Sequence, residues 1–185
     1  MRSSLRLRTR GRLRVIGAPL VFLTMLTSPL SEVVAGVSGA VWTTLADGSV
    51  VNGNIYDHKE DAYLNGGPAR QCTAAGLPDG DYYFQVTTPS GGTLLSTDDV
   101  AERKFRVSGG IVVAYLGFTH VVGTGKCGSV TIQLMPYLDT HNVGGESKVW
   151  VTPVEAYDPA TATQPNFGFS PSESKTDNFK IEVTD

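Results

Sequence analysis

The sequence contains few of the residues that build metal sites and catalytic centres. Two cysteines and three histidines occur among its 185 residues. No Cys-x-x-Cys pair is present, so a structural zinc site lacks its usual ligand spacing. No Gly-x-Ser-x-Gly motif is present, and the Ser-x-x-Lys match at 172–175 lacks the further motifs that penicillin-recognising enzymes carry. These absences predict a chain without catalytic activity.

The histidines give no triad signal either. They are far apart in the sequence, and we interpret all three as surface or loop residues: His58, His120 and His141. A Ser, His and Asp set could be assembled from any chain with these counts, so an extracellular hydrolase is kept as an alternative without a motif of its own.

A long hydrophobic run is also missing. A membrane-spanning helix needs about 20 apolar residues. The apolar stretch at 15–26 contains Pro19, and Pro29 and Glu32 follow it. A membrane anchor is therefore the weaker interpretation of this region.

The amino terminus instead has the layout of a signal peptide. Six arginines and no acidic residue precede the apolar stretch, and small residues follow it at 31–40. A basic start, an apolar run and small residues are typical of secretory signals. We predict a signal peptide at 1–35, cleaved after Ala35, with cleavage after Ala40 as the alternative. A single domain is expected at 41–185.

Positive charge becomes scarce once this segment is removed. Removing residues 1–35 takes away six arginines and one glutamate, which leaves nine basic and 17 acidic residues and a net charge of −8. An acidic surface repels phosphate backbones and anionic lipids. We therefore expect a secreted or cell-surface protein that binds neither nucleic acid nor membrane.

The two cysteines agree with export. Cys72 and Cys127 both follow the signal region, and an even pair in a secreted chain is most simply a disulfide. A metal site is the alternative, but no histidine lies near either thiol in the sequence.

The region after the signal shows no helical period. Short alternating runs separated by Gly, Pro, Asn and Asp occur at 41–45, 54–56, 62–64, 82–86, 93–95, 104–107, 111–118, 129–135, 147–154 and 179–183. We predict an all-β fold of about eight strands, an antiparallel β-sandwich, with a closed barrel as the alternative. The most apolar run, 111–118, is our candidate central strand. The segment 157–176 is rich in Pro, Ser and Thr and is predicted to be a loop.

The stretch 77–86 is the clearest element. Pro78-Asp79-Gly80 has turn chemistry, and an alternating strand follows directly. Alternation places Tyr82, Phe84 and Val86 on the core face. Gln85 is expected on the opposite, exposed face.

Two groups of side chains are candidates for ligand binding. Carboxylates at predicted loops offer hard oxygen ligands for Ca²⁺, the one candidate metal: Asp57, Glu60, Asp61, Asp79 and Asp81. Solvated turns are the competing interpretation. Trp42 and Trp150 are candidate stacking platforms for a carbohydrate, or else buried core residues.

Several stretches resemble a known family. These are Tyr63-Leu64-Asn65-Gly66-Gly67-Pro68, residues 77–86, Val149-Trp150-Val151-Thr152-Pro153, and Lys175-Thr176-Asp177-Asn178-Phe179-Lys180. They resemble prealbumin-like β-sandwich modules of exported bacterial surface proteins, among them the B-type repeats of collagen adhesins. The resemblance implies an immunoglobulin-like or prealbumin-like fold and a structural or adhesive role.

The chain departs from that family in one respect. Many adhesin repeats carry a Lys to Asn isopeptide bond whose lysine lies in the first strand, and residues 41–51 contain no lysine. We therefore expect no isopeptide. The leading hypothesis is a non-catalytic structural or adhesive module that binds an extracellular protein or glycan. A carbohydrate-binding module is the first alternative and an extracellular hydrolase the second.

Overall fold

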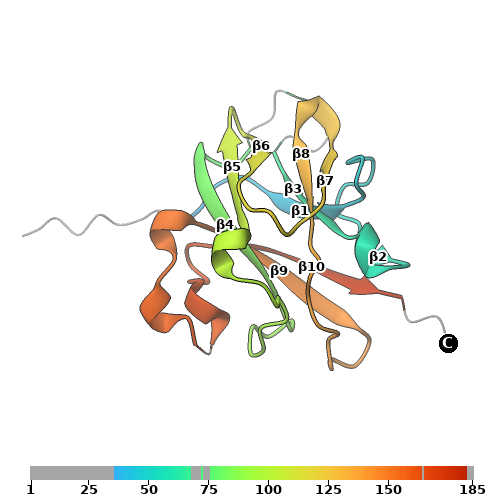
Figure 1. Cartoon of the computed structure of the whole chain (residues 1–185), viewed down its shortest axis with the longest axis vertical. Helices are drawn as coiled ribbons and strands as arrows, with labels where there is room; N and C mark the ends of the chain where they lie inside the picture. Colours follow the sequence, from blue (N-terminus) through green and yellow to red (C-terminus); the bar gives the residue numbers. More distant parts are fainter. Residues whose placement is uncertain (1–35, 68–71, 73–75, 164, 183–185) are drawn as a thin grey trace, which may run out of the picture. The chain divides into compact units, whose positions relative to one another are not determined.

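Strands form most of the regular structure among the described residues. The computed structural model describes residues 36–67, 72, 76–163 and 165–182. Within these residues the helical elements are 3₁₀ turns of three residues each, and ten strands form two sheets (Figure 1). The all-β prediction is confirmed, although ten strands are present where about eight are expected.

The smaller sheet has four strands in the order β1-β3-β8-β7. Their bounds are Val41–Thr44 for β1, Tyr63–Gly66 for β3, Val122–Thr124 for β7 and Val130–Gln133 for β8. All neighbouring pairs are antiparallel. Strand β7 has no counterpart in the sequence prediction, because its Gly123 and its short length hide the alternation.

The larger sheet has six strands in the order β2-β10-β9-β4-β5-β6. Their bounds are Ile55–Tyr56 (β2), Gly80–Thr87 (β4), Lys104–Ser108 (β5), Ile111–Tyr115 (β6), Glu146–Pro153 (β9) and Lys175–Ile181 (β10). Strand β2 pairs with β10 in parallel, which corrects the fully antiparallel prediction. Two backbone hydrogen bonds hold this short strand: Lys180 N–H donates to Asn54 O, and Glu182 N–H donates to Tyr56 O.

One hydrophobic core lies between the sheets. It takes Phe84 and Val149 from the larger sheet, and Leu64 and Ile132 from the smaller sheet, and each of these side chains is buried. Tyr82, Phe84 and Val86 all face this core, as their alternation predicts. Truncating a buried phenylalanine to alanine typically costs about 3–5 kcal/mol.

The most apolar run is not central. Residues 111–115 form β6, at the edge of the larger sheet, whereas β9 and β4 each have neighbours on both sides. Val113 is 39% exposed and Phe118 is 93% exposed, so much of this apolar surface is not buried. The predicted central position of this strand is therefore wrong, because the order of strands in a sheet depends on pairing between distant segments.

The segment after β9 covers part of the larger sheet. It contains three 3₁₀ turns, Val154–Ala156, Pro159–Thr161 and Asn166–Gly168, beside β4 and β9 (Figure 1). Gln85 Nε2 donates to the Asn166 carbonyl at 2.8 Å, and the rings of Tyr83 and Tyr157 meet edge to face. Gln85 is 1% exposed, so the prediction that it faces solvent is wrong. The last two residues of the predicted loop 157–176 belong to β10.

The disulfide joins two connections of the fold. Cys72, between β3 and β4, is bonded to Cys127, between β7 and β8, as predicted, with 5.5 Å between their Cα atoms. In the chain-entropy model a cross-link across a loop of this length restricts the unfolded chain by about 4 kcal/mol.

Candidate functional site

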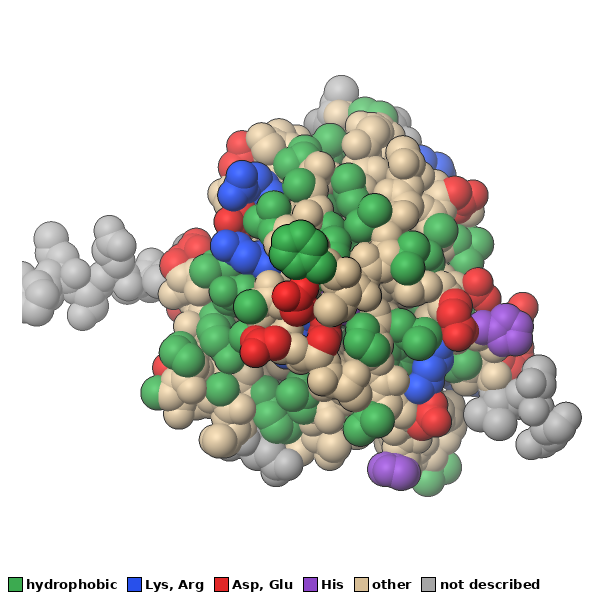
Figure 2. Space-filling view, in the orientation of Figure 1, with side chains coloured by type: hydrophobic (Ala, Val, Ile, Leu, Met, Phe, Trp, Pro, Cys, Tyr) green, Lys and Arg blue, Asp and Glu red, His purple; other side chains and the backbone are tan. Residues whose placement is uncertain are grey.

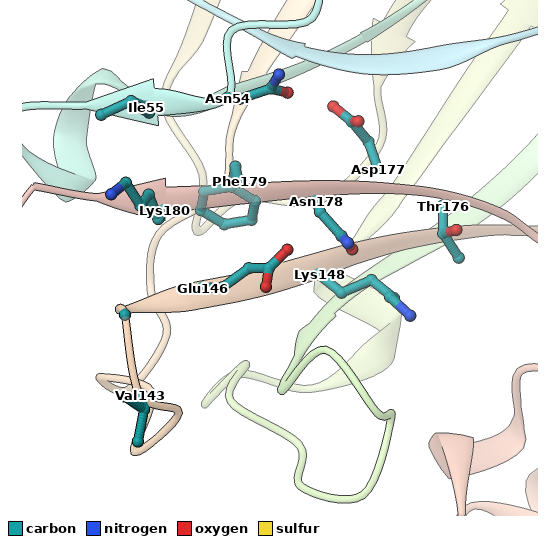
Figure 3. Close-up of a pocket in the computed structure, with 11 residues that line it drawn as sticks. Asn54, Ile55, Val143, Glu146, Lys148, Thr176, Asp177, Asn178, Phe179 and Lys180 are labelled. Carbon is teal, nitrogen blue, oxygen red and sulfur yellow. The ribbon is translucent and has the colours of Figure 1, made fainter.

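A polar groove lies on the outer face of the larger sheet, where β9, β10 and β2 meet. Alternation along β9 and β10 turns five side chains to this face: Glu146, Lys148, Thr176, Asn178 and Lys180. Lys148 lies directly opposite Asn178, and Glu146 directly opposite Lys180. Figure 3 shows the Glu146, Asn178 and Lys148 side chains on the same side of the two strands.

Apolar residues form the rim of the groove. Ile55 on the short edge strand β2 is 56% exposed. Val143, in the turn before β9, is 97% exposed and extends from the loop below the strands in Figure 3. Strand β2 is two residues long and pairs only with Lys180 and Ile181 of β10. The groove has a volume of ≈ 650 Å³.

The charges of the groove stand out against the rest of the chain. Elsewhere most cations are paired: Lys59 lies near Asp139, Arg103 near Asp98, and both Lys104 and Arg106 near Asp81. In Figure 2 the basic side chains of the visible face also lie close to acidic ones. Among the described residues, the lysines outside such ion pairs are Lys126, Lys148, Lys175 and Lys180. Two of them line the groove.

The groove can therefore make several kinds of polar contact. Its ammonium groups donate hydrogen bonds, its carboxylate accepts them, and the Asn178 amide does both. Lys148 Nζ lies over the Trp150 ring, 5.5 Å from its centre. This ammonium group therefore lies where the groove adjoins the covered part of the sheet. Such a surface suits a polar partner with anionic or amide groups.

Asp177 also lines the groove, but its carboxylate has a structural role. Its carboxylate accepts hydrogen bonds from Thr43 N at 2.7 Å and Thr43 Oγ1 at 3.0 Å, and so links β10 to β1 of the other sheet. Burial raises the pKa of Asp177, and the bonds from Thr43 offset part of this rise. In Figure 3 its side chain points away from Glu146 and Lys148.

A second polar cluster is enclosed. His120 Nε2 lies 2.8 Å from Asp98 Oδ2, and Arg103 Nε lies 3.5 Å from Asp98 Oδ1. The exposed fractions of these side chains are 0% for His120, 8% for Asp98 and 5% for Arg103. Burial raises the pKa of Asp98, but the hydrogen bonds from His120 and Thr119 outweigh it, so that this pKa lies below its ordinary value.

This cluster joins loops and does not form an open site. His120 Nδ1 also faces the carbonyl of Gln133 at 2.8 Å, so both ring nitrogens are engaged. We predict a surface or loop histidine at this position from the sequence. His120 lies in a loop, but its side chain is buried. The Asp98 contact spans 22 residues, and no local motif indicates it.

The predicted calcium ligands are not brought together. Asp57, Glu60 and Asp61 lie between β2 and β3, whereas Asp79 and Asp81 lie at the start of β4. Among the described residues, no three Asp, Glu, His or Cys side chains are grouped so that they could hold a metal ion. Asp81 instead accepts two hydrogen bonds from Arg106, which with those from Lys104 bring its pKa to about 2.

The rings of both tryptophans are buried. Trp42 is 6% exposed and Trp150 is 5% exposed. Trp150 Nε1 donates to Thr87 Oγ1 at 2.9 Å, which satisfies its buried polar group. Burial of both rings counts against the predicted stacking role.

The sequence did contain a signal for the groove. Thr176, Asn178 and Lys180 alternate with Asp177, Phe179 and Ile181, but Pro and Ser nearby led us to place the start of this run in a loop. Extending the 179–183 strand backwards by four residues would have placed three groove side chains on one face.

Comparisons with protein-family models, with curated proteins and with solved structures find no match. The resemblance to prealbumin-like modules therefore stays a prediction. Within the described residues, no helix has the length and apolar character needed to cross a membrane.

Proposed function

We propose that this chain is an exported, non-catalytic β-sandwich module of the immunoglobulin-like or prealbumin-like type, and that it binds an extracellular protein through the groove between β2, β10 and β9. The observation that carries the proposal is the uneven cover of the larger sheet. The 3₁₀ segment covers the outer face at Gln85, and Gly91 of the turn after β4 lies against Trp150, but Lys148, Asn178 and Lys180 stay accessible.

Two further features support this role. The groove combines a polar floor with the exposed apolar side chains of Ile55 and Val143 at its rim. Mixed polar and apolar surface is the usual make-up of a non-obligate protein interface. The disulfide between Cys72 and Cys127 suits an oxidising compartment.

A glycan is the second candidate partner. The ammonium, amide and hydroxyl groups of Lys148, Asn178 and Thr176 are suited to sugar hydroxyl groups. Stacking of a sugar ring has less support, because Phe179, which also lines the groove, is 1% exposed. We therefore rank the protein partner first.

The hydrolase alternative has weaker support. Its best acid and base pair would be Asp98 and His120, and both side chains are enclosed. A substrate atom would have to come within hydrogen-bond reach of these groups. The side chains packed around Asp98 and His120 stabilise the fold and leave a substrate no access to them.

The proposal is tested by binding measurements on the exported protein. A panel of immobilised extracellular matrix proteins, with a second panel of glycans, is scanned by surface plasmon resonance. For a partner found in this way, the double variant Lys148→Ala/Asn178→Ala should weaken binding about tenfold or more, or about 1.4 kcal/mol.

The matched control is Thr124→Ala/Lys126→Ala, which also removes one lysine and one polar side chain, both exposed, from the region of β7. This control should bind as the unchanged protein does. Equal weakening by both variants, or none by the groove variant, would contradict the assignment of the groove.

A further inference from the structure

Residues 36–40, which precede the first strand, are part of the folded domain. The Val37 side chain packs against the hydrophobic core. A Cβ atom built on Gly36 would lie 2.9 Å from the Ser172 carbonyl oxygen, so this backbone runs close to the segment before β10. Gly39 has a φ of +85°, and its Cα faces the Gly76 backbone so closely that a side chain would collide with it. Residues 36–40 therefore pack closely against neighbouring parts of the domain.

The sequence offers two cleavage positions, one at each end of this segment. Val33-Val34-Ala35 and Ser38-Gly39-Ala40 both have a small residue at the cut and a small or modest one two positions before it. A cut after Ala40 would remove Val37 from the core and the backbone that covers Gly76. A cut after Ala35 would retain all of these contacts.

We infer that export ends with hydrolysis of the Ala35–Gly36 peptide bond, so that the mature protein begins at Gly36. Water adds across this bond in a reaction catalysed by the signal-peptide protease of the exporting cell. Ala35 leaves with the new carboxylate, and Gly36 keeps the new amino group. This inference rests on the proposed export of the chain.

The surroundings of Gly36 suit the charge that cleavage creates. An α-amino group is largely protonated at neutral pH. Gly36 lines a pocket of ≈ 320 Å³ together with Asp79, Asp81 and Glu155. Asp81 is paired with Lys104 and Arg106, but Asp79 and Glu155 form no ion pair among the described residues. The new ammonium group therefore borders the same pocket as three carboxylates, two of which have no ion-pair partner among the described residues, and opposite charges attract.

The first test is the amino terminus of the exported product. The full chain is expressed in a bacterial host with a secretory pathway, and the protein outside the cytoplasm is analysed by intact mass and amino-terminal sequencing. Gly36 is the expected first residue. Val41 as the first residue would overturn the inference and leave export intact, whereas a retained Met1 on a cell-bound chain would contradict export itself.

Two matched variants locate the cut independently. Val33→Asp places a charge two positions before Ala35, and Ser38→Asp places the same charge two positions before Ala40. Val33→Asp should make the uncleaved precursor accumulate, and Ser38→Asp should leave processing unchanged. The reverse pattern would overturn the inference.

A third variant asks whether the segment remains in the product. Val37→Asp should lower the urea midpoint of the exported protein, because it puts a charge against the core. Ser38→Asp, at an exposed neighbouring position, serves as the control and should shift the midpoint much less. Equal midpoints for the two variants would mean that residue 37 has been removed, and would overturn the inference.

Discussion

The outer face of the larger sheet has two halves that share strand β9. In the covered half, Gln85 lies under the 3₁₀ segment and Trp150 lies against Gly91, and their exposed fractions are 1% and 5%. In the open half, Lys148 and Asn178 line the groove. Trp150 and Lys148 are two residues apart and point in the same direction, yet Trp150 is buried and Lys148 lines the groove. The alternation of a strand gives the direction of a side chain, and a distant segment decides whether that side chain meets solvent.

The largest expected effect distinguishes the two halves at Trp150. Trp150→Ala removes a buried ring and its hydrogen bond to Thr87, so we expect the free energy of unfolding to fall by about 3–5 kcal/mol. Urea denaturation followed by circular dichroism measures this loss. A loss below about 1 kcal/mol is typical of a surface site, and would mean that Trp150 is not covered.

A smaller effect compares equivalent polar residues in the two halves. Gln85→Ala removes a buried donor and leaves the Asn166 carbonyl without it, which should cost about 1–3 kcal/mol. Asn178→Ala, in the open half, should stay within about 0.5 kcal/mol. Both variants are compared in the same urea titration, and equal losses would mean that the halves do not differ in cover.

The sequence predicted what depends on neighbouring residues. The alternation of Tyr82, Phe84 and Val86, and the pairing of two cysteines, follow from local pattern and from counting. The edge position of β6, the burial of Gln85 and the contact between Asp98 and His120 depend on segments far apart in the chain. No local hydrophobic period in the sequence predicts such contacts, and the segment that covers Gln85 has no such period at all. The groove falls between these cases, because its residues alternate but the cover that ends beside them is nonlocal.

A third prediction concerns charge on the same outer face, where β4 meets β5. Hydrogen bonds from Arg106 and Lys104, against a smaller effect of burial, lower the pKa of Asp81 from 3.8 to about 2. The folded state therefore favours the carboxylate, and its contribution is present above about pH 4 and is lost as the pH falls toward 2. The shift corresponds to at most about 2 kcal/mol, and solvent screening reduces this to about 1 kcal/mol.

Urea titrations of Asp81→Asn at several pH values measure this contribution. The variant should be about 1 kcal/mol less stable at pH 7 and should converge with the unchanged protein near pH 2. A stability difference that stays constant across this range would show that the ion pair is not its source.

Thiol labelling tests most directly whether the two halves differ. Among the described residues no cysteine is unpaired, so a single introduced thiol reports on its own site. Asn178→Cys and Gln85→Cys are each treated with a maleimide under native conditions, and again after unfolding in urea without reductant. We expect Asn178→Cys to react at close to its unfolded rate. Gln85→Cys should react about a hundredfold or more slowly, because its labelling requires the covering segment to open. Similar native rates at both positions would contradict the division of this face into a covered half and an open half.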